Sequence, residues 1–249
     1  MARKLDPNRL EDLAQAGFRA FAEKGFRRTQ MLDVARELGV SAGSLYNYVA
    51  SKEALFLLVL QRQNQDEPLA LPEELPLSAP SEDDFLVEIR KALRRRVKMA
   101  ALAEAVEAPC PADCADEFEG VVRSIYQDLS RGRGVLILLE RSAADWPALS
   151  AQYGGSTSRY LKRLTSYLGT RADAGKLRVG PSVHASARLI AETCAWFAMR
   201  RPLAHRSGID DETAEATVVD TLCRAFLPVE PARKNPGPKR NDARRNKHV

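Results

Sequence analysis

Residues 30–52 read QMLDVARELGVSAGSLYNYVASK, and this stretch decides the fold. Its first part carries apolar side chains at helical spacing, which predicts a short helix over residues 30–38. Gly39 can adopt the positive φ that ends a helix, and the hydroxyl of Ser41 can cap a following one. We therefore predict a second helix over residues 42–49, with Leu45 and Val49 facing inward.

Two short helices joined by a tight turn form a helix-turn-helix, whose second helix enters the DNA major groove with its N-terminal residues leading. Small residues at 42–44 would let the backbone approach the bases, and Asn47 can form two hydrogen bonds with an adenine edge. Neighbouring polar side chains and the N-terminus of the first helix could contact phosphates. The predicted DNA-binding residues are Arg28, Thr29, Gln30, Ser41, Ala42, Gly43, Ser44, Tyr46, Asn47, Tyr48 and Lys52. The alternative interpretation is an ordinary helical hairpin.

The same stretch and its flanks resemble the tetracycline-repressor (TetR) family of bacterial transcription regulators. The resemblance rests on AEKGF within residues 21–26, DVARELGVSAGSLYNY at residues 33–48 and SKEAL at residues 51–55. The sequence departs from the family pattern at Val49, where Phe is usual, and at Leu38, where Ala is common. Both departures stay apolar, so they concern packing. The resemblance covers roughly the first fifth of the chain and implies a DNA-binding head on a larger helical body.

Further helices follow from apolar spacing along the rest of the chain. The run VLILLE at residues 135–140 could by itself be a buried strand, but its position between helices favours a buried helix. The additional predicted helices cover residues 7–24, 52–66, 82–107, 115–130, 135–145, 147–169, 182–201 and 210–227. We predict an all-α fold of about nine helices, divided into a helix-turn-helix domain (1–52), an effector-binding and dimerisation domain (53–228) and a disordered basic tail (229–249).

The distribution of charge supports this division. The net charge is +3 for residues 1–52, −3 for residues 53–228 and +5 for residues 229–249. Local basic charge at the head suits DNA, because affinity for the phosphate backbone depends on nearby Lys and Arg. The chain has no long apolar run and no apolar signal core, and its four cysteines have no framework spacing. These features predict a cytoplasmic protein that neither enters a membrane nor is secreted.

The resemblance also implies a homodimer and a small-molecule effector. In the family the last two helices pair with those of a second subunit, here residues 182–201 and 210–227. The candidate effector-pocket residues are Met99, Tyr126, Trp146, Trp196 and Phe197, although residues of this kind are more often plain core than ligand contacts. Few charges lie on the predicted inner faces, so we expect a mainly apolar effector.

Two polar clusters allow more than one interpretation. Arg94, Arg95 and Arg96 could hold an anionic effector or form a solvated helix face. Cys110 and Cys114 could be a redox pair, half of a metal site, or loop thiols without a partner. No neighbouring His or further Cys completes a set of metal ligands, so we predict no metal and no cofactor.

Three functions are compatible with these features. The favoured one is a DNA-binding transcription regulator, usually a repressor in this family, that binds a palindromic operator as a homodimer and is released by its effector. An effector-free architectural DNA-binding protein is the alternative. An enzyme is the third, but the three histidines, His184, His205 and His248, accompany no nucleophile motif or metal pair, so we predict no catalytic residues.

Overall fold

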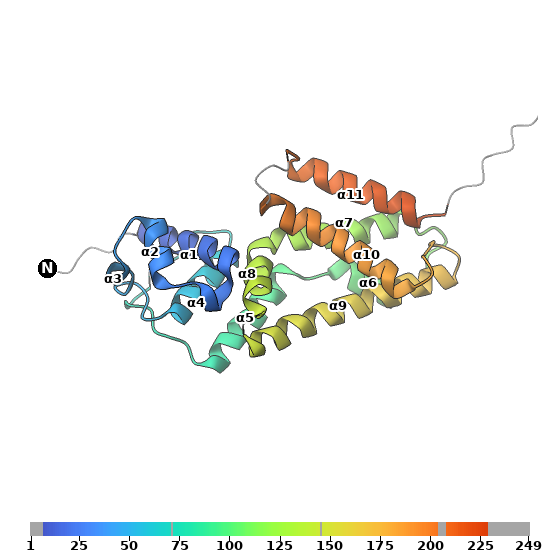
Figure 1. Ribbon diagram of the computed structural model, residues 1–249. Coiled ribbons are helices and arrows are strands. Elements are labelled where there is room, and N and C mark those ends of the chain that lie inside the picture. Colours follow the sequence, from blue (N-terminus) through green and yellow to red (C-terminus); the bar gives the residue numbers. More distant parts are fainter. Residues whose placement is uncertain (1–6, 71, 145, 204–207, 229–249) are drawn as a thin grey trace, which may run out of the picture.

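The computed structural model describes residues 7–70, 72–144, 146–203 and 208–228 (Figure 1). Within these ranges the chain forms eleven α-helices and no strand, which confirms the predicted all-α class and corrects the predicted number of about nine. The predicted basic tail at residues 229–249 lies outside the described residues. No helix in the described part combines the length and apolar character needed to cross a bilayer.

The first four helices form the head. They are α1 (Pro7–Arg28), α2 (Met31–Leu38), α3 (Ala42–Leu45) and α4 (Lys52–Gln63). α1 is interrupted at Gly25, which has a φ of 75°, and Gly39 ends α2 with a φ of 67°. Glycine adopts these positive φ values without the steric cost that a side chain would add. Ser51 caps α4 as predicted, because its hydroxyl accepts a hydrogen bond from the Ala54 N–H at 3.1 Å.

The second helix of the motif is shorter than predicted. α3 ends at Leu45, and a turn takes the place of the helix expected as far as Val49. The chain after this turn pairs with the α4–α5 loop: the Leu77 N–H donates to the Tyr48 carbonyl and the Ala50 N–H to the Leu77 carbonyl, both at 2.8 Å. These bonds hold the backbone in an extended conformation, so the helix cannot continue. Leu45 and Val49 are nevertheless buried, as expected.

The remaining helices form the body. They are α5 (Glu82–Arg96), α6 (Ala100–Glu107), α7 (Ala115–Arg131), α8 (Arg133–Ala143), α9 (Pro147–Asp173), α10 (Val183–Ala195) and α11 (Asp211–Phe226). α10 continues through a π-helical turn (Trp196–Arg200) and a 3-10 turn (Arg201–Leu203). The VLILLE run is a buried helix within α8, as predicted from its setting.

The helix predicted over residues 82–107 is broken in two. Met99 has a φ of 49°, and its N–H donates to the carboxylate of Asp128, which is only 2% exposed. This buried acceptor on α7 binds the Met99 amide in place of a helical carbonyl, so the helix is interrupted between Arg96 and Ala100. Sequence spacing alone could not indicate this bond, because its partners are 29 residues apart.

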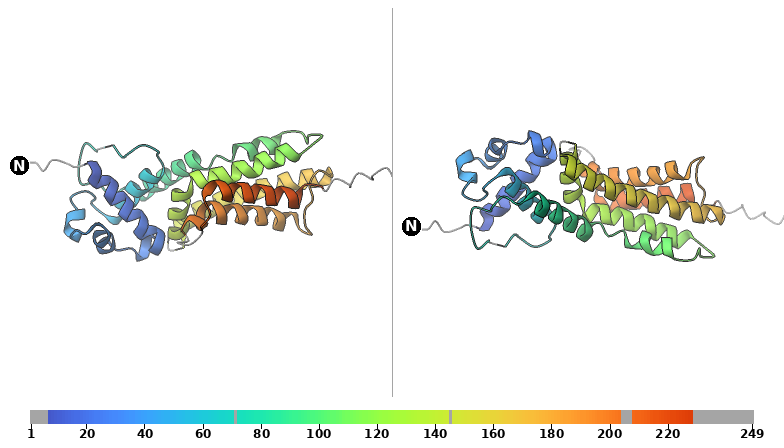
Figure 2. Two further views of the ribbon diagram at one scale, coloured as in Figure 1. Left: turned by 90° about the horizontal axis from the view of Figure 1, so that it is seen from above. Right: turned by 90° about the horizontal axis from the view of Figure 1, so that it is seen from below.

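The molecule is elongated, with the head at one end of the helical body (Figures 1 and 2). α9 extends along one side of the body, α10 packs against both α9 and α7, and α11 packs against α7. α8 crosses the end of the body and packs against α1, so it forms much of the contact between body and head.

An aromatic cluster completes this contact. The ring of Trp146, between α8 and α9, lies 4.4 Å from the ring of Phe85 and 4.6 Å from that of Phe26, measured between centroids. Phe56 of α4 packs edge-on against both Phe21 and Phe26 of α1. Offset and edge-to-face pairs of this kind each stabilise by about 0.5–1.5 kcal/mol beyond the area they bury. The head is therefore packed firmly against the body.

Candidate nucleic-acid interface

The N-terminal tip of α3 is exposed at the end of the molecule distant from the body (Figure 1). Ser41 and Gly43 are exposed, and an added Cβ at Gly43 would have only the Ser41 Oγ nearby, at 3.9 Å. Tyr46, which is 49% exposed, and Asn47 follow on the same outer surface. The smallest side chains thus stand where a DNA backbone or base edge could approach the helix most closely.

Not every predicted polar group in α3 has the role expected of it. The Ser41 hydroxyl does not cap the helix; its Oγ lies 2.9 Å from the Ser44 Oγ. Ala42, Ser44 and Tyr48 are half-buried. The Tyr48 carbonyl is already engaged by Leu77, so this residue also belongs to the support of the motif.

The prediction that the Thr29 side chain contacts DNA is wrong. Thr29 is 1% exposed, and its hydroxyl is directed to the carbonyl oxygens of Gly25 and Ala20, at 2.7 and 3.1 Å. The change of backbone direction at Gly25 points the Thr29 side chain into the head. It does not cap α2 either, because the cap position belongs to Gln30, whose N–H donates to Asp33 Oδ2 at 2.8 Å.

Lys52 is also committed within the head. Its Nζ donates to the carbonyl oxygens of Thr29 at 3.1 Å and Arg27 at 3.3 Å, and it lies 4.5 Å from the centroid of the Phe26 ring. Burial lowers the pKa of this ammonium. An ammonium has three donors, so at most one N–H is left for a phosphate. The main role of Lys52 is therefore to connect the start of α4 to the turn before α2 through these hydrogen bonds.

Two ion pairs that the sequence spacing did not indicate brace α2 against α1. Lys24 Nζ lies 2.8 Å from Asp33 Oδ1, and Arg19 Nε lies 3.0 Å from Glu37 Oε2. The hydrogen bond from Lys24, followed by that from the Gln30 N–H, lowers the pKa of Asp33. Arg28 and Gln30 remain exposed beside this pair, at the N-terminus of α2. The arrangement presents the start of α2 and the tip of α3 on one braced support.

The five candidate effector-pocket residues lie at four separate places. Met99 is buried at the break between α5 and α6, and Trp146 belongs to the aromatic cluster between head and body. Trp196 and Phe197 contact each other in the π-helical turn, where Trp196 is 46% exposed. Contacts with side chains far apart in sequence determine where each of these residues lies. The type of residue alone therefore could not predict which of them line a common pocket.

Tyr126 lines the groove found in the described part of the body. This groove lies between α7 and α11 and has a volume of about 420 Å³. Most of its other lining residues are polar or charged, and they include Arg123, Glu215 and Asp211. Arg123 bridges the groove to Glu215 of α11 at 3.1 Å and also pairs with Glu119 at 2.7 Å. The groove therefore differs in character from the apolar pocket that the sequence predicts.

An exposed helix tip of small residues, on a braced helix-turn-helix joined to a helical body, is the arrangement expected of a DNA-binding protein. Residues 13–59 match the family model described as bacterial regulatory proteins of the tetR family. The match covers the helix-turn-helix head and confirms the resemblance to the TetR family that the sequence indicated there. Comparison with curated proteins gives no match.

Several solved structures are similar to this chain. The ketosteroid transcriptional regulator KstR2 of Mycobacterium tuberculosis is 19% identical, with 89% of this chain and 96% of that one covered and a TM-score of 0.52. A tetR-family regulatory protein from Rhodococcus RHA1 is 17% identical, with coverage of 87% and 95% and a TM-score of 0.49. A regulator from Saccharomonospora viridis in complex with choline is 16% identical, with coverage of 90% and 100% and a TM-score of 0.48. The likeness to KstR2, at 19% identity, concerns the fold alone.

Proposed function

We propose that this TetR-family regulator is a cytoplasmic homodimeric repressor that binds a palindromic operator and is released by a small, mainly apolar effector. The observation that carries the DNA-binding part is the exposed tip of α3, where Gly43 leaves the backbone open to a duplex. Two such tips related by a two-fold axis would match half-sites about one helical turn, or a multiple, apart. We further propose the boundaries 1–52 for the DNA-binding domain and 53–228 for the effector and dimerisation domain.

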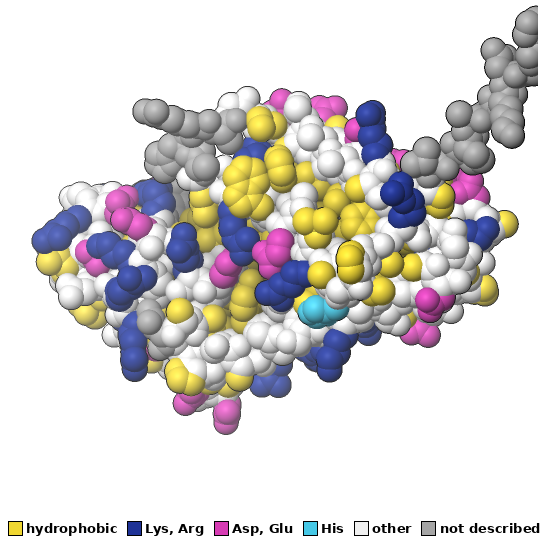
Figure 3. Space-filling view, turned by 45° about the vertical axis from the view of Figure 1, so that its right-hand side comes forward, with side chains coloured by type: hydrophobic (Ala, Val, Ile, Leu, Met, Phe, Trp, Pro, Cys, Tyr) yellow, Lys and Arg dark blue, Asp and Glu magenta, His cyan; other side chains and the backbone are white. Residues whose placement is uncertain are grey.

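The proposed interface between subunits is residues 182–201 with residues 210–227. Apolar side chains gather along α10 and beside α11 on the face seen in Figure 3. Leu189 of α10 is 57% exposed and Trp196 is 46% exposed, which is unusual for large apolar side chains so close together in sequence. A second subunit seated on this face would remove them from water.

The proposed apolar effector is supported by the composition of the interior. The buried side chains of α5, α7, α8 and α9 are apolar apart from a few groups such as Asp128, Ser142 and Arg171. Asp128 and Arg171 are already engaged, with the Met99 N–H and with Glu117. A ligand that opened space among these helices would meet mostly hydrocarbon.

The operator part is tested by electrophoretic mobility shift with the DNA upstream of the protein's own gene. We expect a retarded band at low salt, competed by the same fragment and not by unrelated DNA. Retention of sequences from a genomic DNA pool would extend the test beyond that fragment. If neither the upstream DNA nor any pooled fragment is retained selectively, the proposal fails.

Asn47→Ala should weaken specific binding and relax the preference at one base pair in each half-site. Loss of a bidentate amide–adenine contact costs about 1–3 kcal/mol, or roughly 5- to 150-fold in affinity. The side chain is exposed, so the midpoint of thermal unfolding should not change. Fluorescence anisotropy with single-base-pair variants of the selected site provides the measurement. Gln61→Ala, which removes an exposed amide on α4, is the matched control and should bind as the parent does.

Leu189→Glu should weaken the proposed dimer. A carboxylate buried without a partner in an apolar interface is unfavourable, so we expect the dimer dissociation constant to rise at least about tenfold. Sedimentation velocity over a dilution series measures this constant. Val87→Glu introduces the same charge at an apolar position of α5 that is 40% exposed, and should leave the dimer intact. Equal dissociation constants for the two variants would place the interface elsewhere.

A further inference from the structure

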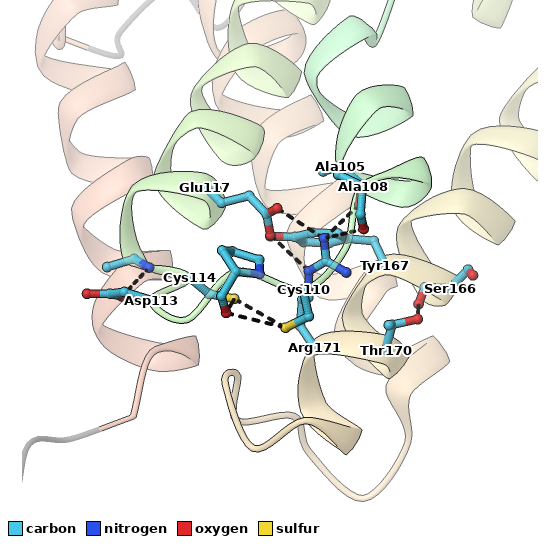
Figure 4. Close-up of polar contacts among 12 residues, drawn as sticks. Ala105, Ala108, Cys110, Asp113, Cys114, Glu117, Ser166, Tyr167, Thr170 and Arg171 are labelled. Atoms are coloured by element: carbon cyan, nitrogen blue, oxygen red, sulfur yellow. Dashed lines mark hydrogen bonds and ion pairs between the residues drawn. The ribbon is translucent and has the colours of Figure 1, made fainter.

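The loop between α6 and α7 holds two cysteines side by side. Cys110 Sγ and Cys114 Sγ are 3.8 Å apart, and both sulfur atoms also face the Pro111 carbonyl (Figure 4). A disulfide has an S–S bond of about 2.05 Å, so the sulfurs need to approach by less than 2 Å, a shift of roughly 1.8 Å. Cys110 lies in the loop between the two helices, whereas the Cys114 carbonyl accepts the Phe118 N–H at the start of α7. Movement of Cys110 towards Cys114 therefore leaves the hydrogen bonds of both helices in place.

The surrounding residues keep this loop in place. The Arg171 guanidinium, from α9, donates to the carbonyl oxygens of Ala105 and Ala108 at 2.8 and 3.3 Å. Lys176 Nζ donates to the Ala112 carbonyl at 2.6 Å, on the other side of the cysteines. The two thiols are thus held together by contacts on both sides, and their proximity is a built feature of the fold.

The two thiols differ in access. Cys110 is half-buried, so a small oxidant can reach it, whereas Cys114 is 2% exposed. Burial, followed by the hydrogen bond with Cys110, raises the pKa of Cys114 to about 11. No group of three or more His, Cys, Asp or Glu side chains in the described ranges is arranged to hold a metal ion. The pair therefore offers two sulfurs and no further ligand.

We propose that Cys110 and Cys114 form an oxidative modification site, which a hydroperoxide converts to an intramolecular disulfide. Cys110 Sγ attacks the terminal oxygen of the hydroperoxide, the S–O bond forms as the O–O bond breaks, and the thiol proton leaves with the alcohol. Cys114 Sγ then attacks the sulfur of this sulfenic acid. The S–S bond forms, the S–O bond breaks, and the second thiol proton leaves with hydroxide as water. Two thiols are oxidised by two electrons, and one hydroperoxide is reduced to an alcohol and water.

The test treats the reduced full-length protein with cumene hydroperoxide and counts free thiols in the unfolded product. We expect two of the four free thiols to disappear and the mass of the chain to fall by that of two hydrogen atoms. Peptide mapping should join Cys110 to Cys114, and dithiothreitol should restore all four thiols. Four free thiols after treatment, or a disulfide that joins other cysteines or two chains, would overturn the proposal.

Single substitutions separate the two roles. Cys114→Ser should stop at a sulfenic acid on Cys110, which dimedone traps as a thioether adduct, while Cys110→Ser should give neither disulfide nor adduct at Cys114. Cys223→Ser, a half-buried cysteine on α11, is the matched control and should still lose two thiols. Circular dichroism checks that each variant is folded. The reverse pattern, with the adduct on Cys114, would contradict the assignment of Cys110 as the first sulfur to react. These outcomes are independent of DNA binding.

Discussion

Gly43→Glu should remove operator binding while the protein stays folded. Gly43 is exposed near the start of α3, and a Cβ there meets nothing closer than the Ser41 Oγ at 3.9 Å, so the backbone can accept a side chain. At the tip of the helix proposed to enter the groove, a carboxylate would fill the space needed by the duplex and face its phosphates. Juxtaposed like charges cost several kcal/mol, so we expect affinity to fall at least about 100-fold.

A matched control distinguishes this effect from a general effect of charge. Gly120→Glu makes the same change on α7, where Gly120 is exposed and a Cβ would have no neighbour within 4 Å. It should bind DNA as the parent does. Thermal unfolding followed by circular dichroism should show both variants to be at least as stable as the parent, because glycine within a helix is unfavourable by about 1 kcal/mol. Normal DNA affinity of Gly43→Glu would mean that the tip of α3 does not enter the groove.

Arg171→Met should cause the largest loss of stability in the body. The guanidinium is 1% exposed, and Nε and one terminal nitrogen donate to the two carboxylate oxygens of Glu117 at 2.9 and 3.0 Å. It also donates to the carbonyl oxygens of Ala105 and Ala108. Removal leaves two carbonyls without this donor and a mostly buried carboxylate with the Tyr167 hydroxyl as its remaining side-chain donor, at a cost of about 3–5 kcal/mol. Glu117 keeps some contact with water, so the lower end of this range is expected.

Urea unfolding followed by far-UV circular dichroism measures the change in the free energy of unfolding. The free energy of unfolding should fall less in the double variant Arg171→Met with Glu117→Leu than in Arg171→Met alone, because no charge is then left without its partner. A loss below about 1 kcal/mol for Arg171→Met would mean that solvent compensates the ion pair, as at an exposed site.

The helix-turn-helix could be predicted from sequence because its determinants are local. Gly25 and Gly39 end helices through their own backbone freedom, and the apolar spacing around them sets the buried faces. The shortness of α3 could not be predicted, because it depends on Leu77, which is nearly thirty residues further along the chain. The break at Met99 depends in the same way on Asp128.

In the candidate site, too, features set by local sequence could be predicted, and features set by long-range contacts could not. The helical period predicts that Gly43 and Asn47 are exposed, and both are, although Asn47 lies in the turn after α3. The inward position of Thr29 and the engagement of Lys52 depend on the carbonyls that the Gly25 reversal brings near them. The pocket residues were the least predictable, since an aromatic side chain can pack equally well against a ligand or against other rings.

The position of Trp146 gives the protein a natural optical probe. Its indole is stacked on Phe85 of the body and lies close to Phe26, at the base of the helix-turn-helix. The chain contains only two tryptophans, so Trp196→Phe leaves Trp146 as the single emitter. Any movement of the head relative to the body changes the surroundings of that indole. Its emission wavelength would therefore register the coupling between effector and DNA in solution, without an attached dye.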